Sequence, residues 1–135
     1  MPEAPLPFAV REFLGQPHPA ALATLGRDGA PQATAVWFLL EGEVLLVNTA
    51  RGRSKARNLD RDPRVALAVF DAQEPSRSVQ VRGRVQGRRE GAAAAADLQR
   101  LSRHYTGHDF PAAEDRISYL ITPESWSSYG LIEGD

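Results

Sequence analysis

Four basic side chains alternate along one short segment, and no acidic residue separates them: Arg51, Arg53, Lys55 and Arg57. An Arg guanidinium can bind two phosphate oxygens at once, and a Lys ammonium supplies a compact point charge. Thr49 and Ser54 add hydroxyl donors, and Gly52 lets the backbone come close to a ligand. The segment lies where an apolar strand ends and helix formers begin, so unpaired helix amides would point at the same place. These residues predict a site for a phosphate-bearing ligand.

The same charges have a second interpretation. A helix that begins in water often carries basic side chains that pair with nearby acids, here Asp60 and Asp62. Charge and spacing weigh equally for the two interpretations, so both stay open at this point. Among the 16 basic residues of the chain, Lys55 is the only lysine, which makes it a residue to follow.

Other residue types that do chemistry form no comparable group. The three histidines have no metal-like partner spacing, and no Ser-His-Asp arrangement or pair of acids stands out, so we predict neither a metal site nor a catalytic side chain. A protein without such groups can still support redox chemistry, because a cofactor then carries the reaction. We expect Trp37 to pack in the core or form a wall of a pocket. Trp126 and Tyr129 either line the substrate side or simply pack.

Composition excludes several classes of protein. The chain has 135 residues, a formal net charge of −1 and no cysteine, so we expect one domain over residues 1–135 without a disulfide or thiolate site. The balanced charge argues against a nucleic-acid or anionic-membrane partner. No apolar run approaches the ~20 residues of a membrane span, and no signal segment opens the chain, so a cytoplasmic protein is expected. A domain this small would gain from burying surface against a second copy.

Hydrophobic periodicity predicts the elements that must position the basic segment. We expect short helices at 7–14, in the segment 50–59 after its leading glycine and basic residues, and at 91–104, with Asp62-Pro63 ending the second. Alternating apolar residues predict six strands, with an edge piece at 125–131: 20–25, 32–40, 43–48, 64–70, 78–86 (with a bulge at Gly83) and 117–122. The first three strands would form a meander. The fold class expected is therefore mainly β with short helices, as a closed or partly closed antiparallel barrel.

Three stretches of the chain combine into a known pattern. The first runs from Asn48 through Lys55-Ala56 and Pro63-Arg64-Val65 to Leu67. The second is the strand 20–25 with the Gly-Arg-Asp-Gly turn and Pro31-Gln32 after it, and the third, residues 36–38, reads Val-Trp-Phe. Together they resemble the pyridoxamine 5′-phosphate oxidase-like, FMN-binding split-barrel superfamily, and the third is similar to the branch that uses the deazaflavin coenzyme F-420. The resemblance implies a six-stranded split β-barrel that forms a homodimer.

The resemblance also implies cofactor-binding residues. It places phosphate contacts at the end of one strand and the start of the following helix: Thr49, Arg53, Ser54 and Lys55. Asn48, next to them, is expected to bind the cofactor as well. The strand along the flavin ring would comprise Ala33, Thr34, Ala35, Val36 and Trp37. Ser78 and Gln80 would approach the cofactor from the second subunit. Arg51 and Arg57 would suit the phosphate and glutamyl tail of coenzyme F-420.

Two departures from the family pattern bear on the activity. Residues 34–39 carry no charge where pyridoxamine phosphate oxidases have an Arg and a Lys, and the chain does not end with their Arg-x-His motif. Both departures speak against vitamin B6 oxidation and favour coenzyme F-420 over FMN. We therefore expect a flavin-type oxidoreductase that transfers hydride to a small conjugated substrate, with its cofactor at a homodimer interface. The alternatives are a cofactor carrier or redox sensor without turnover, and a structural barrel whose basic segment meets a partner's acids.

Overall fold

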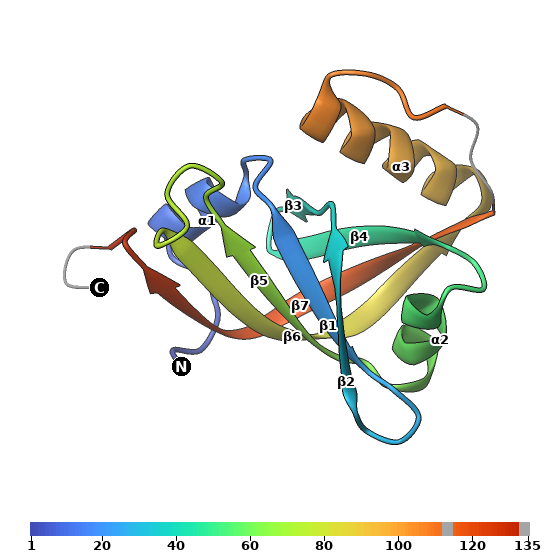
Figure 1. The fold of residues 1–135 in the computed structure, drawn as a ribbon, viewed down its shortest axis with the longest axis horizontal. Helices are drawn as coiled ribbons and strands as arrows, with labels where there is room; N and C mark the ends of the chain where they lie inside the picture. The colour runs from blue at the N-terminus through green and yellow to red at the C-terminus, as the bar shows by residue number, and fades with distance from the viewer. Residues whose placement is uncertain (112–114, 133–135) are drawn as a thin grey trace.

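A computed structural model describes residues 1–111 and 115–132 of the chain (Figure 1). Three helices are present in these ranges: α1 (Phe8–Leu14), α2 (Ser54–Arg61) and α3 (Gly91–Thr106). Seven strands accompany them: β1 (Ala20–Leu25), β2 (Pro31–Val36), β3 (Leu39–Glu41), β4 (Val44–Ala50), β5 (Arg64–Phe70), β6 (Ser78–Glu90) and β7 (Arg116–Tyr129). The predicted mainly β fold with short helices is confirmed.

The strands form one antiparallel sheet in the order β2-β1-β5-β6-β7-β4-β3. The predicted count of six strands is wrong, because the run at 32–40 is two strands, β2 and β3, on opposite edges of the sheet. Trp37 and Phe38 separate them, and Phe38 turns into the core, where it is fully buried. The predicted meander is wrong for the same reason: β2 pairs with β1, whereas β3 pairs with β4.

The sheet therefore curls without closing. Its two edge strands are only two residues apart in the sequence, so the edges must approach each other at that corner although no ladder joins them in the described residues. This is the arrangement expected of a split barrel. The two longest strands are β6 and β7. The strand predicted at 117–122 and most of the edge piece predicted at 125–131 belong to the single strand β7.

A bulge bends β6 against β7, as the sequence predicts. The pairing register shifts between Arg82 and Gly83, and again between Val85 and Gly87. A Cβ atom added to Gly83 would lie 2.5 Å from the carbonyl oxygen of Thr122, too close for any side chain. Glycine is required at position 83 because two backbones approach each other there.

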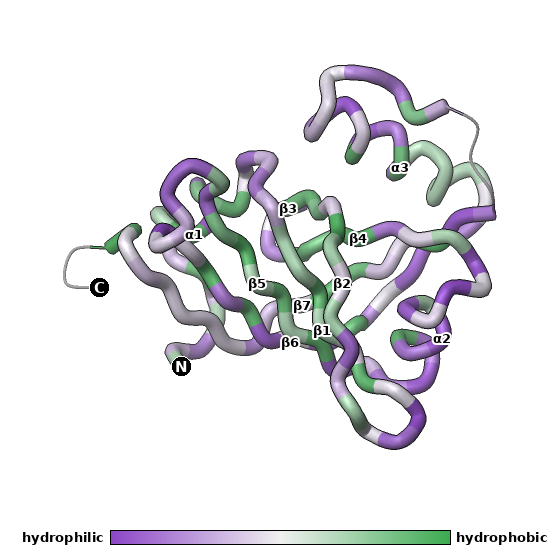
Figure 2. The backbone as a smooth tube through the Cα atoms, in the orientation of Figure 1, coloured by the Kyte–Doolittle hydropathy of each residue, from purple (hydrophilic) through white to green (hydrophobic). Residues whose placement is uncertain are grey.

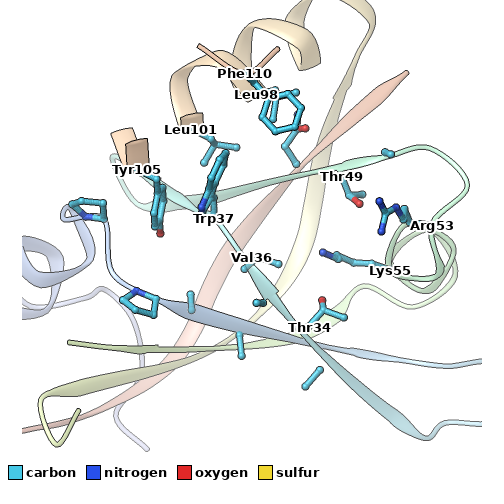
Figure 3. A pocket seen from close by; sticks show the side chains of 18 of the residues that line it. Thr34, Val36, Trp37, Thr49, Arg53, Lys55, Leu98, Leu101, Tyr105 and Phe110 are labelled. Atoms are coloured by element: carbon cyan, nitrogen blue, oxygen red, sulfur yellow. The ribbon is translucent and has the colours of Figure 1, made fainter. Parts of the chain in front are cut away.

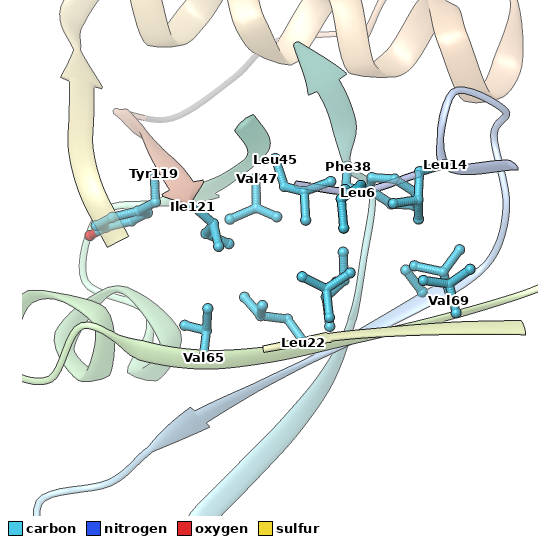
Figure 4. Packing of buried hydrophobic residues seen from close by; sticks show 14 of the residues in the cluster. Leu6, Leu14, Leu22, Phe38, Leu45, Val47, Val65, Val69, Tyr119 and Ile121 are labelled. Atoms are coloured by element: carbon cyan, nitrogen blue, oxygen red, sulfur yellow. The ribbon is translucent and has the colours of Figure 1, made fainter. Parts of the chain in front are cut away.

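The core lies inside the curled sheet. Alternate residues of each strand point inward, as Leu22, Leu67 and Val81 do, and these three lie side by side on neighbouring strands. The apolar residues follow the strands in Figure 2, and Figure 4 shows the buried side chains meeting between the two halves of the sheet. Their neighbours along the strands face outward.

Two helices are fastened to the sheet by buried polar groups. In α2, the Asn58 amide donates to Thr24 Oγ1 at 3.0 Å and to Gln32 Oε1 at 2.9 Å, which fixes the helix to β1 and β2. In α3, Asp97 is 3% exposed and packs toward β6 and β7. Neither α2, α3 nor any other helix in the described ranges has the length and apolarity needed to cross a membrane.

Candidate functional site

A cleft of about 820 Å³ opens between β2, β4, α2 and α3. Figure 3 shows side chains from all four elements pointing into it. Its lining residues are Pro17, Pro19, Ala20, Ala21, Ala33, Thr34, Ala35, Val36, Trp37, Asn48, Thr49, Ala50, Arg53, Lys55, Phe70, Ala72, Leu98, Leu101, Tyr105, Phe110 and Arg116. This volume is within the range of small-molecule and cofactor sites.

One end of the cleft is cationic. Arg53, Lys55 and Arg116 line it, and the lining residues within 1–111 and 115–132 include no carboxylate. Burial lowers the pKa of the Lys55 ammonium, and the positive charges of Arg53 and Arg116 lower it further. Neither Arg53 nor Lys55 forms an ion pair within residues 1–111 and 115–132. A bound anion would stabilise the charged ammonium of Lys55 against both effects.

The start of α2 adds backbone donors at this end. The helix begins at Ser54, and no side chain caps its first amides in the described structure. Gly52 has a φ of +91°, and a Cβ there would meet no neighbour within 4 Å. Glycine at position 52 therefore serves the turn itself, which aims the helix at the cleft. Thr49, which is 5% exposed, lines the cleft near the end of β4 and offers a hydroxyl there.

The other two basic residues of the segment have different surroundings. Arg51 donates to Glu90 at 2.6 Å and to Asp115 at 2.7 Å, and these partners raise its pKa. Arg57 folds back onto the carbonyl oxygen of Gly52 and onto Ser54 Oγ. The structure thus brings Arg53 and Lys55 to the cleft and leaves Ser54 and Arg57 outside its lining.

The acids that could have neutralised the segment are engaged elsewhere. Asp60 accepts from Arg88 and from the Tyr119 hydroxyl, and Asp62 accepts from Arg64. The ion pairs that the second interpretation required of Asp60 and Asp62 are therefore made with arginines outside the basic segment. This leaves the charges of Arg53 and Lys55 directed at the cleft.

A chain of hydrogen bonds supports Arg116 from behind. Its Nε donates to Asn48 Oδ1 at 2.8 Å, and the Asn48 amide donates to Ser118 Oγ and to the Ala94 carbonyl oxygen, both at 2.9 Å. Ser118 Oγ in turn donates to the buried Asp97 at 2.7 Å. Asn48 thus joins the cleft to α3 and has a positioning role as well as a place in the lining.

The opposite end of the cleft is aromatic. The Trp37 and Tyr105 rings stack at 5.5 Å between centroids with a 15° interplanar angle, and Phe110 meets Trp37 edge-on at 6.3 Å. The Tyr105 hydroxyl donates to the His18 carbonyl oxygen at 2.8 Å and accepts from the Phe38 amide at 3.4 Å. Burial raises the pKa of Tyr105 to about 12, so its hydroxyl is neutral at physiological pH.

Ser78 and Gln80 lie in a different place. Together with Phe70, Ser127 and Tyr129 they line a separate hollow of about 440 Å³ on the outer face of the sheet. Phe70 lines both hollows, so the two adjoin at β5. Within one chain, the predicted ring residues and the predicted phosphate residues other than Ser54 therefore share the cleft, whereas Ser78 and Gln80 do not.

Several lining residues were missed by the sequence analysis: Arg116, Tyr105, Phe110, Leu98 and Leu101. Arg116 reaches the cleft because it is paired with Ala50 across β4 and β7, a long-range register with no local signal. Leu98 and Leu101 are buried and also form part of the cleft wall.

Comparison with known proteins agrees with this geometry. Residues 6–130 match the family described as pyridoxamine 5′-phosphate oxidase. The chain belongs to the pyridoxamine 5′-phosphate oxidase-like family. The resemblance drawn from the sequence is thereby confirmed for almost the whole chain.

Solved structures extend this family assignment. A structure named as an F420 reductase is 32% identical, covers 92% of this chain and 98% of its own, and has a TM-score of 0.77. A conserved hypothetical protein from Mycobacterium tuberculosis is 24% identical with a TM-score of 0.75, over 94% of this chain and 86% of its own. A putative pyridoxamine 5′-phosphate oxidase from Listeria innocua is 17% identical with a TM-score of 0.69, over 88% and 94%. The last two show the shared fold alone. No curated protein matches the chain.

Proposed function

We propose that this member of the pyridoxamine 5′-phosphate oxidase-like family is an oxidoreductase that binds a flavin-type cofactor, coenzyme F-420 in preference to FMN. The observation that carries the proposal is the cationic end of the cleft, where the charges of Arg53 and Lys55 are directed at one cavity. The 32% identity to an F420 reductase supports the choice of cofactor, as does the absence of charge along residues 34–39.

The donor set fits such a cofactor. Guanidinium and ammonium groups, the Thr49 hydroxyl and the free amides at the start of α2 are the groups that hold phosphate in proteins. Beside them, β2 offers an edge of the sheet with the small, exposed residues Ala33 and Ala35. A flat ring could lie along this edge, since no long side chain stands in its way there.

The cleft residues then have distinct roles in binding the cofactor. Arg53, Lys55 and Thr49 bind the phosphate, and Asn48 orients Arg116 toward it. Val36 and Trp37 bound the ring on the inner side of the cleft. The bound cofactor supplies the hydride chemistry, and the protein binds, orients and shields it. The proposed reaction requires no covalent bond between a side chain and the small conjugated substrate.

We further propose that two copies assemble through the outer face of the sheet. The pairing registers place Ala35, Ala21 and Ala68 in one row across β2, β1 and β5, with Ala33, Ala23 and Ala66 in the next row. Such a surface of small side chains permits close approach of a second sheet. Because the cleft and the hollow of Ser78 and Gln80 both border this face, a partner copy would contribute to the cofactor site.

Titration with the two cofactors tests the proposal. Purified protein is titrated with coenzyme F-420 and with FMN, and binding is followed by the change in cofactor fluorescence. We expect tighter binding of coenzyme F-420 and a two-chain assembly. Tight binding without reduction of any conjugated acceptor would instead indicate a carrier or redox sensor, and failure to bind either cofactor would contradict the proposal.

A further inference from the structure

The cleft has two chemically different ends. The charged lining residues that the structure describes are Arg53, Lys55 and Arg116, and they lie around the start of α2 and the β4–β7 pair. The wall formed by α3 and the β2–β3 corner carries rings and aliphatic side chains. Figure 3 shows this separation, with Val36 between the cationic end and the group of Trp37, Leu101 and Tyr105.

The aromatic end is built on a break in the sheet. Phe38 is fully buried in the core, whereas the preceding Trp37 is partly exposed and faces the cleft. The Phe38 amide donates to the Tyr105 hydroxyl, which itself donates to His18. The hydroxyl of Tyr105 is thus engaged with two backbone groups, and it is the ring that Tyr105 presents to the cleft.

The third ring is held in place although it belongs to a loop. Gln99 on α3 accepts from the Phe110 amide at 2.8 Å and donates to the Phe110 carbonyl oxygen at 3.1 Å. Ser102 donates to the His108 carbonyl oxygen at 2.7 Å, which fastens the same loop one turn further along α3. A loop tied down at both points presents Phe110 to Trp37 before any ligand arrives, and such preorganisation reduces the entropic cost of binding.

Packing against the core accounts for only part of this arrangement. Tyr105 packs against the hydrophobic core, whereas Trp37 and Phe110 line the cleft, are partly exposed and lie outside the core cluster. Three fixed rings beside Leu98 and Leu101, with no charged group among them, form a surface suited to a flat, uncharged ring system.

We infer that the aromatic end of the cleft is a separate subsite for an uncharged aromatic molecule, the second reactant of the proposed oxidoreductase. The inference rests on the proposed function, because it leaves the cationic end and β2 to the cofactor. Aromatic anions are disfavoured at this subsite, since the described side chains of its walls offer an anion no counter-charge. The subsite therefore favours planar, neutral compounds over planar anions.

Nuclear magnetic resonance can locate the ligand directly. The chain has two tryptophans, so the two indole N–H signals are assigned by comparison with Trp126→Phe. The Trp126 indole N–H is buried and serves as an internal reference. Quinoline, an uncharged bicyclic ring, is titrated into the free protein and into protein saturated with coenzyme F-420. We expect the Trp37 signal to shift in both titrations, and 2-naphthoate, a carboxylate of similar size, to bind there at least about tenfold more weakly.

Matched variants test whether quinoline binds against the aromatic rings of the cleft. Phe110→Ala is expected to weaken quinoline binding about two- to tenfold, the range of one aromatic contact. Phe8→Ala removes the same side chain from α1, where Phe8 is 78% exposed and outside the cleft, and leaves binding unchanged. If Phe110→Ala fails to fold, Gln99→Ala keeps the ring and releases its loop, and it is expected to weaken binding in the same direction.

The outcomes separate this inference from the proposed function. An unmoved Trp37 signal, or displacement of quinoline by coenzyme F-420, would overturn the subsite, the second result because the aromatic end would then hold the cofactor ring. Different results would contradict the proposed function: coenzyme F-420 does not bind, or Lys55→Ala retains full affinity for it. Equal binding of 2-naphthoate would overturn the selection for neutral compounds.

Discussion

Lys55 is the residue on which the phosphate assignment depends most. We predict that Lys55→Ala weakens the affinity for coenzyme F-420 by roughly 10- to 100-fold, since a hydrogen bond to a charged group contributes about 1.5–3 kcal/mol. Titration of cofactor fluorescence measures the loss. Arg27→Ala removes one positive charge from the exposed turn between β1 and β2 and controls for net charge, with no change in affinity expected. Equal affinities for the two variants would contradict the phosphate assignment.

The lowered pKa of Lys55 makes cofactor affinity depend on pH. A bound phosphate favours the charged ammonium, so affinity is full below the Lys55 pKa and falls as the pH rises through it. Burial together with Arg53 and Arg116 lowers this pKa, and the fall therefore begins at a lower pH than for an ordinary lysine. Titrations at a series of pH values above neutrality measure it. In Lys55→Arg, whose guanidinium keeps its proton, the decline at this pH is expected to disappear.

At the scale of elements, the bulge between β6 and β7 fixes the bend of the sheet. We predict that Gly83→Ala destabilises the protein by about 1–3 kcal/mol or more, because its Cβ would overlap a backbone oxygen that cannot move aside. Gly87→Ala is the matched control: its Cβ would lie 3.3 Å from a Leu120 methyl group, which can rotate. Urea unfolding of both variants measures the difference, and equal destabilisation would contradict the account of the bulge.

The anchor of α3 is the buried carboxylate of Asp97. It accepts from Arg89 and Arg100 as well as from Ser118, so removing it leaves several donors without their partner. We predict that Asp97→Ala costs about 2–4 kcal/mol, somewhat below a fully buried ion pair because both arginines are partly exposed. Thermal and urea unfolding measure this cost. A surface-like effect below about 0.5 kcal/mol would show that α3 is held by its apolar face instead.

Elements that depend on local pattern were predictable from the sequence. The alternation in β1 and β5, the helix start at the basic segment and the bulge at Gly83 all follow from short-range signals. The split of residues 32–40 does not, because each half pairs with a different strand and the apolar pattern runs through both. Only the tertiary pairing decides that Phe38 turns inward.

The residues of the candidate site also fall into two groups, those predictable from local sequence and those that depend on distant contacts. Arg53, Lys55 and Thr49 were predictable because a phosphate site at a helix start has a local signature. Arg116, Tyr105 and Phe110 come from distant parts of the chain and reach the cleft through strand register and loop fastening. Arg57 lies outside the described cleft lining, because its guanidinium folds back onto the carbonyl oxygen of Gly52 in its own turn.

At the scale of the whole molecule, the alanine rows predict the oligomeric state. We expect the wild-type protein to have twice the 14.7 kDa mass of one chain, and Ala68→Glu to shift it toward the monomer by placing a carboxylate in the middle of the contact. Sedimentation velocity measures both masses. Ala92→Glu adds the same charge to an exposed position on α3 and is expected to remain a dimer. A wild-type monomer would contradict the shared site.

The position of Lys55 also has a practical consequence. Since the chain has a single lysine and no cysteine, Lys55 and the N-terminus are its only primary amines. An amine-directed reagent such as formaldehyde with a mild reductant can therefore place an isotopic methyl reporter in the cleft of the unmutated protein. The lowered pKa favours this reaction over that of an ordinary lysine, because more of the amine is unprotonated. A ligand bound at the cationic end would then protect one atom, Lys55 Nζ, from methylation.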